Sequence, residues 1–154
     1  MILYLDASAL VKRYVDEPGS VEVNQAISQA EMTGTALVSR AEVAAALAKA
    51  VRVGALSQQE AARCLRAFRE EWLDLVRVQV TEFVIARADV LAWEHSLRGY
   101  DAIHLAAASV WQDLMGQPVT FATFDRHLWG AAQQAGLTVY PTDLPAMLER
   151  WKGQ

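Results

Sequence analysis

Short apolar runs alternate along the chain with longer segments in which apolar residues recur every three or four positions. Apolar runs of this length predict strands, whereas the three-to-four spacing predicts amphipathic helices. Short strands separated by helices are typical of a parallel sheet covered on both faces, so we expect a three-layer α/β fold with about five strands. The expected strands span residues 2–5, 35–38, 77–80, 119–122 and 137–140, and the expected helices span residues 8–15, 20–32, 40–53, 61–76, 83–97, 100–114 and 125–135.

Several element boundaries carry their own signals. Residues 33–34 (Thr-Gly) are typical of a turn. Ser39 is expected to cap the helix over residues 40–53, and Ser57 with Glu60 has the spacing of a capping box. Thr81 is expected to cap the following amphipathic helix, with Gly99 as its end. One apolar face of that helix, which we interpret as core or interface, comprises Phe83, Ala86, Val90, Trp93 and Leu97.

Composition narrows the class of protein. The 154 residues suit one domain over residues 1–154, with residues 142–154 as a helical tail, and 53% hydrophobic residues exclude wholesale disorder. The apolar runs are far shorter than the ~20 residues of a membrane helix. No basic region precedes the first apolar run, so a signal peptide is not expected. With Cys64 as the single cysteine, a disulfide within the chain is excluded. We expect a soluble cytoplasmic protein without a membrane partner.

The net charge of −4 argues against binding nucleic acid through bulk positive charge. The distribution of charge along the chain weakens that conclusion, because four acids have basic neighbours in the sequence. A cation site edged by phosphate-binding charge would have this pattern, and so would scattered surface ion pairs. The pairs in question are Asp6 with Lys12 and Arg13, Glu42 with Arg40, Asp101 with Arg98, and Asp125 with Arg126.

The same four acids occupy corresponding places in the predicted fold. Asp6 directly follows a strand and Asp125 follows another after two residues, while Glu42 and Asp101 lie in the first turns of helices. Each acid alone is explained by helix capping or by the helix dipole. Together they could converge at the carboxyl ends of the strands, where ligands bind in such folds. Converging carboxylates repel one another unless they are protonated or bind a cation, and carboxylate oxygens suit Mg²⁺ or Mn²⁺.

The motifs LDASALVK (residues 5–12), YDAIHLA (residues 100–106) and TFDR (residues 123–126), with the helix that carries Glu42, resemble those of the PIN-domain nucleases. They are most similar to the VapC-type toxins of toxin–antitoxin pairs, over about residues 1–141. The resemblance implies a PIN-like sheet with strand order 3-2-1-4-5 and a metal-dependent endoribonuclease. It also implies an RNA substrate, Mg²⁺ (or Mn²⁺) as cofactor, and a cognate antitoxin as partner.

Roles follow from the resemblance residue by residue. Asp6, Asp101 and Asp125 would be the main metal ligands, and Glu42 a further ligand or the group that orients the attacking water. Two small polar residues, Ser8 and Thr123, would hydrogen-bond a carboxylate or a metal-bound water, although helix capping and turn formation explain them equally well. His104 is expected to pack or hydrogen-bond beneath the site. Candidates for phosphate contacts, each of which could instead be a solvated surface charge, are Lys12, Arg13, Arg40 and Arg126.

Other functions remain open. A haloacid-dehalogenase-type phosphatase also has an aspartate after its first strand, but it needs a second aspartate where this chain has Ser8. A receiver domain needs a lysine after the last strand, and residues 140–143 contain none. A non-catalytic scaffold that binds RNA or protein, or an RNA-processing nuclease outside a toxin system, would share the same fold. The small, aromatic-rich chain also suggests a homodimer.

Overall fold

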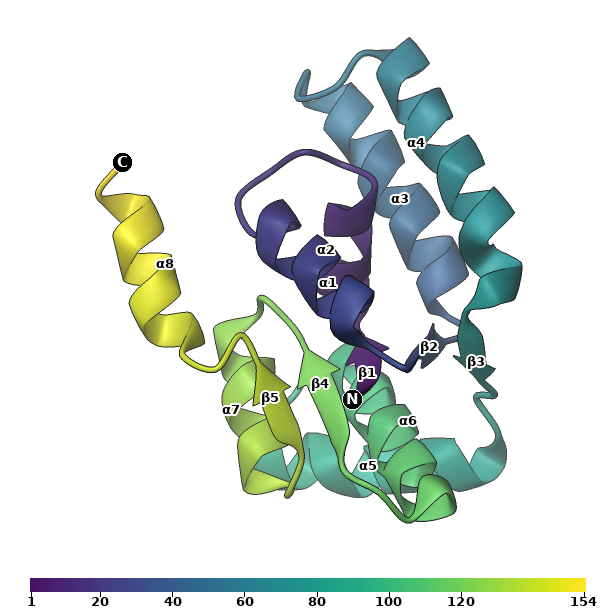
Figure 1. Ribbon diagram of the computed structural model, residues 1–154. Coiled ribbons are helices and arrows are strands. Elements are labelled where there is room, and N and C mark those ends of the chain that lie inside the picture. Colours follow the sequence, from purple (N-terminus) through teal and green to yellow (C-terminus); the bar gives the residue numbers. More distant parts are fainter.

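The computed structural model describes residues 1–154 as a five-stranded parallel sheet with eight α-helices (Figure 1). The strand order is β3-β2-β1-β4-β5, which confirms the expected α/β fold and order. The strands are β1 (Ile2–Leu5), β2 (Met32–Ala36), β3 (Val76–Val78), β4 (Val119–Ala122) and β5 (Thr138–Tyr140). The helices are α1 (Ala7–Leu10), α2 (Ser20–Gln29), α3 (Ser39–Arg52), α4 (Gln58–Glu71), α5 (Glu82–His95), α6 (Gly99–Met115), α7 (Arg126–Gln134) and α8 (Leu144–Lys152).

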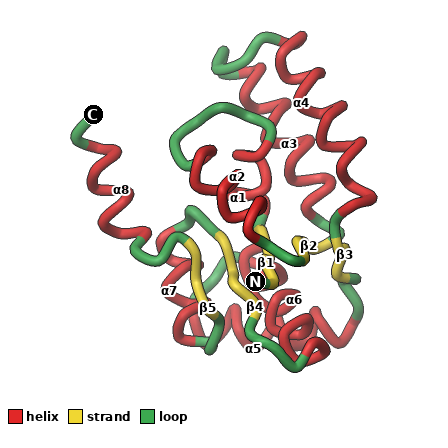
Figure 2. The backbone as a smooth tube through the Cα atoms, in the orientation of Figure 1, coloured by secondary structure: helices red, strands yellow, loops and turns green.

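Helices cover both faces of the sheet, and one hydrophobic cluster lies on each side of it. The strands are short and most of the chain is helical (Figure 2). One cluster packs α1 to α4 onto the sheet and includes Leu5, Val43 and Phe68. The other packs α5 to α7 and includes Tyr4 and Phe121. Adjacent residues of β1 therefore point into opposite cores, as strand geometry requires, and all four β1 residues are buried.

The topology fixes where the loops after β1 and β4, which carry Asp6 and Asp125, lie. The chain builds β1, β2 and β3 in one direction and then returns to add β4 and β5 on the other side of β1. The change of direction lies between β1 and β4, the point at which ligands bind in open α/β sheets. Leu5 pairs with Ala122, so the carboxyl ends of these two strands are level. The backbone N–H of Asp6 extends the pairing by donating to the carbonyl of Ala122 at 3.1 Å.

Three expected boundaries in the first half of the chain are wrong. The expected turn at residues 33–34 lies inside β2, which starts at Met32 because that residue pairs with Ile2 of β1. Gly34 suits this strand because Trp111 of α6 packs against it, and a Cβ atom there would lie 2.8 Å from the indole. Ser39 does not cap α3; its hydroxyl lies 2.6 Å from that of Thr35 in the interior instead. The helix over residues 20–32 accordingly ends earlier, at Gln29.

The capping box at Ser57 and Glu60 and the cap at Thr81 are confirmed, and most of the apolar face of α5 that was expected as core or interface lies outside the core. The helix buries Val84 and Ala88, while Trp93 is 89% exposed. The reason is that α5 packs closely on the alanine-rich α6, so the smaller side chains of α5 face α6 and its larger ones point outward. The helix ends at His95, and Gly99 starts α6 instead of ending α5. The outward-facing apolar stripe comprises Phe83, Val90 and Trp93.

The tail forms α8, which extends away from the sheet (Figure 1). It contacts the body at two points. Leu144 is fully buried at its start, and Trp151 stacks on Phe124 with ring centroids 5.9 Å apart. The amine of Lys12 lies over the same Phe124 ring, 4.7 Å from its centroid. No helix is long and apolar enough to cross a membrane.

Candidate functional site

Asp6 is the buried centre of the candidate site. It follows β1 and caps α1 by accepting a hydrogen bond from the backbone N–H of Ala9 at 2.9 Å. Its Oδ1 also accepts from the hydroxyl of Ser8 at 2.7 Å, and its Oδ2 accepts from that of Thr123 at 2.6 Å. Only 3% of Asp6 is exposed. Burial raises the pKa of this carboxyl above its usual value, while nearby His104 and the two hydroxyls oppose the shift.

The two hydroxyls also join the loops that follow β1 and β4. Ser8 accepts a hydrogen bond from the backbone N–H of Phe124 at 3.0 Å, and Thr123 accepts one from the backbone N–H of Asp125 at 3.1 Å. Thr123 is fully buried. Both hydroxyls donate to Asp6; Ser8 accepts from the loop after β4, and Thr123 accepts from Asp125 in its own loop, which together fix the position of Asp125 relative to Asp6. Both residues thus do more than cap a helix or form a turn.

Glu42 lies in the first turn of α3. Two buried side chains, His104 of α6 and Tyr4 of β1, hold it through consecutive hydrogen bonds. Its Oε1 lies 2.6 Å from Nε2 of His104, and Nδ1 of His104 lies 2.8 Å from the hydroxyl of Tyr4. Burial raises the pKa of Tyr4 well above its usual value, and the charges of Asp6 and Glu42 add to this shift. Tyr4 therefore keeps its proton and can donate a hydrogen bond to Nδ1 of His104. The imidazole proton then lies on Nε2, where it faces Glu42. The expected role of His104, hydrogen bonding beneath the site, is confirmed.

Asp101 and Asp125 share a cation, the guanidinium of Arg98. Nε of Arg98 lies 3.1 Å from Oδ2 of Asp101, and Nη2 lies 3.5 Å from Oδ2 of Asp125. The other oxygen of Asp125 caps α7 by accepting from the backbone N–H of Leu128 at 2.8 Å. The hydrogen bond to Asp101 and the two negative charges raise the pKa of Arg98. Because the Arg98 side chain is 81% exposed, it is a surface group that lies across the mouth of the site.

The four predicted acids thus fall into three groups: the buried Asp6, Glu42 on His104, and Asp101 with Asp125 on Arg98. No group of three acidic, histidine or cysteine side chains is arranged so that it could hold a metal ion. The donor set itself fits Mg²⁺ or Mn²⁺, because carboxylate oxygens are the ligands that these ions prefer. The Arg98 cation between two of the acids shows that the pair accommodates positive charge.

The predicted phosphate-binding residues are spread over two sides of the sheet. Lys12 pairs with Glu17 at 2.9 Å, and Arg13 pairs with Glu71 at 3.2 Å, so nearby carboxylates offset both charges. Arg40 lies over the ring of Trp72, 5.8 Å from its centroid. Arg126 is exposed in the first turn of α7, beside Asp125. The structure does not bring these four cations together.

Sequence reasoning missed the bridging role of Arg98 and the chain from Tyr4 to Glu42. Arg98 precedes Asp101 by three residues, a spacing at which side chains meet at the start of a helix, so a local signal existed. Its reach to Asp125 depends on the packing of α6 beside α7 and has no such signal. The bond between Tyr4 and His104 joins residues 100 positions apart and likewise depends on the tertiary fold.

The α/β fold places Asp6 after β1 and Asp125 after β4, on the two sides of the point where the sheet changes direction, and comparison with known proteins gives the family. The family model described as PIN domain matches residues 3–133. The chain is 35% identical to Ribonuclease VapC45 of Mycobacterium tuberculosis over 144 residues, which cover 93% of this chain and 97% of that protein. It therefore belongs to the VapC-type branch of the PIN-domain family.

Solved structures agree on the fold. The crystal structure of PAE2754 from Pyrobaculum aerophilum superposes with a TM-score of 0.62 at 20% identity, covering 100% of this chain and 91% of that chain. A toxin–antitoxin complex from Klebsiella pneumoniae contains a chain that superposes with a TM-score of 0.58 at 16% identity, covering 93% of this chain and 98% of that chain. At these identities the likeness extends to the fold alone.

Proposed function

We propose that this protein is a divalent-metal-dependent endoribonuclease and the toxin of a toxin–antitoxin pair. The observation that carries the proposal is a chain of contacts where the sheet changes direction: Thr123 joins Asp6 to the backbone of Asp125, and Arg98 joins Asp125 to Asp101. The name of the curated relative, a ribonuclease at 35% identity over nearly its whole length, supports the same activity. An RNA-processing role would use the same site, and the cellular assay below separates the two.

Asp6, Asp101 and Asp125 would hold Mg²⁺ or Mn²⁺, and Glu42 would be a further ligand or would orient the attacking water. A divalent ion held there supplies a water of lowered pKa and positive charge opposite the phosphate. Ser8 and Thr123 keep the two oxygens of Asp6 in fixed directions. That restraint is the contribution expected of residues behind a metal ligand.

The remaining side chains orient the acids and receive the RNA. The chain from Tyr4 through His104 fixes one oxygen of Glu42, so the other is free to face the water. Arg98 must leave Asp101 and Asp125 for them to take other partners, and its exposed position allows it to move onto a phosphate. Among the predicted phosphate contacts, Arg126 is the best placed, because Lys12 and Arg13 already have carboxylate partners.

We propose two protein partners for this chain: a cognate antitoxin and a second copy of the chain itself. The net charge of −4 suits an antitoxin with a basic segment that covers the acids. The homodimer is supported by the apolar stripe on α5, where Phe83 is 64%, Val90 51% and Trp93 89% exposed. These residues recur at helical spacing on one side of α5, so two copies could pack this face against itself about a twofold axis.

The test is cleavage of total RNA by purified, antitoxin-free protein in EDTA, Mg²⁺ or Mn²⁺. Asp101→Asn is the inactivating variant, and Asp113→Asn is its matched control on the same helix, where Asp113 pairs with Arg87 away from the site. We expect metal-dependent cleavage that is lost in Asp101→Asn by at least about 100-fold and kept in Asp113→Asn. Cleavage that persists in EDTA or in Asp101→Asn contradicts the proposed activity.

The same variants separate the biological roles. Expression in a bacterial host should arrest growth with wild-type protein and with Asp113→Asn, but not with Asp101→Asn. Co-expression of the adjacent gene's product should relieve the arrest if that product is the antitoxin. RNA cleavage without any growth arrest would favour RNA processing. RNA binding without cleavage in any metal would favour the non-catalytic scaffold.

A further inference from the structure

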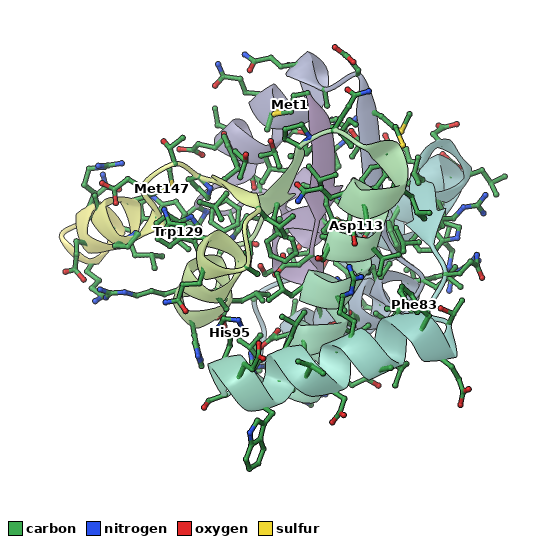
Figure 3. The ribbon with its side chains drawn as sticks, turned by 90° about the horizontal axis from the view of Figure 1, so that it is seen from below. Met1, Phe83, His95, Asp113, Trp129 and Met147 are labelled. Atoms are coloured by element: carbon green, nitrogen blue, oxygen red, sulfur yellow. The ribbon has the colours of Figure 1, made fainter.

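A polar hollow of about 690 Å³ lies between the C-terminal end of α5 and one face of α7, the helix that follows Asp125. We call it the α5–α7 hollow; His95, Ser96, Arg126, His127, Gly130 and Gln134 contribute to its lining. Its volume is within the range of sites that bind a small organic group. Figure 3 shows His95 at the end of α5, where that helix faces α7.

The hollow adjoins the candidate catalytic site through the chain itself. Arg126, on its wall, directly follows Asp125, and Ser96, on the opposite wall, precedes Arg98 by two residues. Arg98 reaches Asp125 at 3.5 Å, so the segments that lead into the two walls are in contact at this end. The hollow is therefore the surface next to Asp125 that a neighbouring nucleotide could reach.

The lining offers separate groups for a phosphate, a ring and a base edge. Arg126 can bind a phosphate oxygen. Nε2 of His127 lies 2.8 Å from the carbonyl oxygen of His95, which fixes the imidazole at the rim as a flat face for stacking. Glu94 and Gln134 can hydrogen-bond the polar edge of a base. Because Glu94 is acidic, the lining suits a complete nucleotide better than a bare phosphate.

Gly130 keeps one wall of the hollow free of a side chain. It lies in the interior of the α7 helix, where glycine costs about 1 kcal/mol relative to alanine. No atom lies within 4 Å of the position that its Cβ would take. Packing therefore does not require glycine here, and its absent side chain leaves the hollow open.

We propose that the α5–α7 hollow binds one nucleotide of single-stranded RNA next to the bond that is cut, and so contributes to sequence selection. The inference rests on the proposed ribonuclease function and adds to it a subsite for the neighbouring nucleotide. It commits to RNA as the occupant, and a segment of the antitoxin is the competing occupant that the experiment must exclude.

The experiment uses Gly130→Leu, whose added side chain would occupy part of the hollow. The leucine projects into open space, and replacing a helical glycine should keep or raise the melting temperature. Gln133→Leu is the matched control, because it adds the same residue to the same helix outside the lining. Fluorescence anisotropy in EDTA then measures the binding of four fluorescein-labelled RNA hexamers, each of a single base, with inorganic phosphate as competitor.

We expect wild type and Gln133→Leu to bind at least one hexamer preferentially, with phosphate a poor competitor. Gly130→Leu should bind that hexamer about tenfold more weakly and lose the preference, as expected for the loss of one stacked base. Folded Gly130→Leu that keeps the affinity and preference overturns the inference, as does wild type without measurable binding. If Gly130→Leu binds RNA normally but loses antitoxin binding, the hollow belongs to the antitoxin. Failure of wild type to cleave total RNA would instead contradict the ribonuclease proposal, so the two failures are distinguishable.

Discussion

Replacing Thr123 with valine removes one buried hydroxyl with almost no change in side-chain shape. Thr123 is fully buried, donates to Asp6 at 2.6 Å and accepts from the N–H of Asp125 at 3.1 Å. A hydrogen bond to a charged group contributes about 1.5–3 kcal/mol, and a buried donor left unpaired costs about 1–3 kcal/mol. Because the N–H of Asp125 is only partly buried, we expect Thr123→Val to lower the free energy of unfolding by about 3 kcal/mol. For a domain of this size the melting temperature should fall by about 6–12 °C.

The loss should depend on pH in a direction that the site dictates. Because burial raises the pKa of Asp6, the folded protein takes up a proton at higher pH than the unfolded chain, and this carboxyl favours folding more as the pH falls through that interval. Removing the Thr123 donor raises the folded-state pKa further, since the hydroxyl favours the charged form. The difference between wild type and Thr123→Val should therefore be largest near pH 7.5 and shrink towards pH 4, where Asp6 becomes protonated.

Urea unfolding at both pH values measures this, with Thr120→Val on the same strand as control. Thr120 is part-exposed in β4, so its replacement should change the free energy of unfolding by less than about 0.5 kcal/mol. A loss below about 1 kcal/mol in Thr123→Val, or a loss equal at both pH values, would refute the reasoning that the hydroxyl stabilises a buried charge.

Two further predictions concern the surface of the site and the surface of α5. Arg98→Gln removes the cation between the two acids, so adding Mn²⁺ should raise the melting temperature of this variant more than that of wild type. Arg87→Gln is the control, and an equal or smaller rise in Arg98→Gln means that Arg98 does not compete with the metal. Trp93→Glu should convert a dimer to a monomer in sedimentation velocity, because it places a charge in the proposed interface. Leu73→Glu, at a 73% exposed position on another element, should remain dimeric, and a dimeric Trp93→Glu assigns the interface elsewhere.

The five strands could be predicted from the sequence because short apolar runs form buried strands wherever they lie in the sheet. For α5 the sequence left core and interface open, because spacing identifies an apolar face without showing which side of the helix meets its neighbour in the core. The neighbour is α6, whose alanines leave room only for the small side of α5. The predicted helix cap at Ser39 is wrong, because its hydroxyl contacts the buried hydroxyl of Thr35 instead.

The candidate acids could be located from sequence, since each follows a strand or opens a helix, but their partners could not. Thr123 donates to Asp6 across 117 positions, and His104 holds Glu42 across 62. Contacts of this kind depend on strands that pair only in the finished sheet. The resemblance to a known family supplied the strand order and the residue roles, which spacing alone left open.

The central position of β1 has a consequence for how the protein is made. Asp6 is among the first residues to be synthesised, but Thr123 and Asp125 emerge near the end of the chain, on the strand that pairs with β1. At about 5–20 residues per second, the ribosome needs about 6–24 s to pass from one to the other. During that interval the nascent chain gains Glu42 and Asp101 but still lacks Thr123 and Asp125. A chain cut short before β4 therefore carries three of the four acids without the strand and the hydroxyl that position Asp6 beside Asp125, and synthesis itself delays the assembled site until β4 and the residues after it have been made.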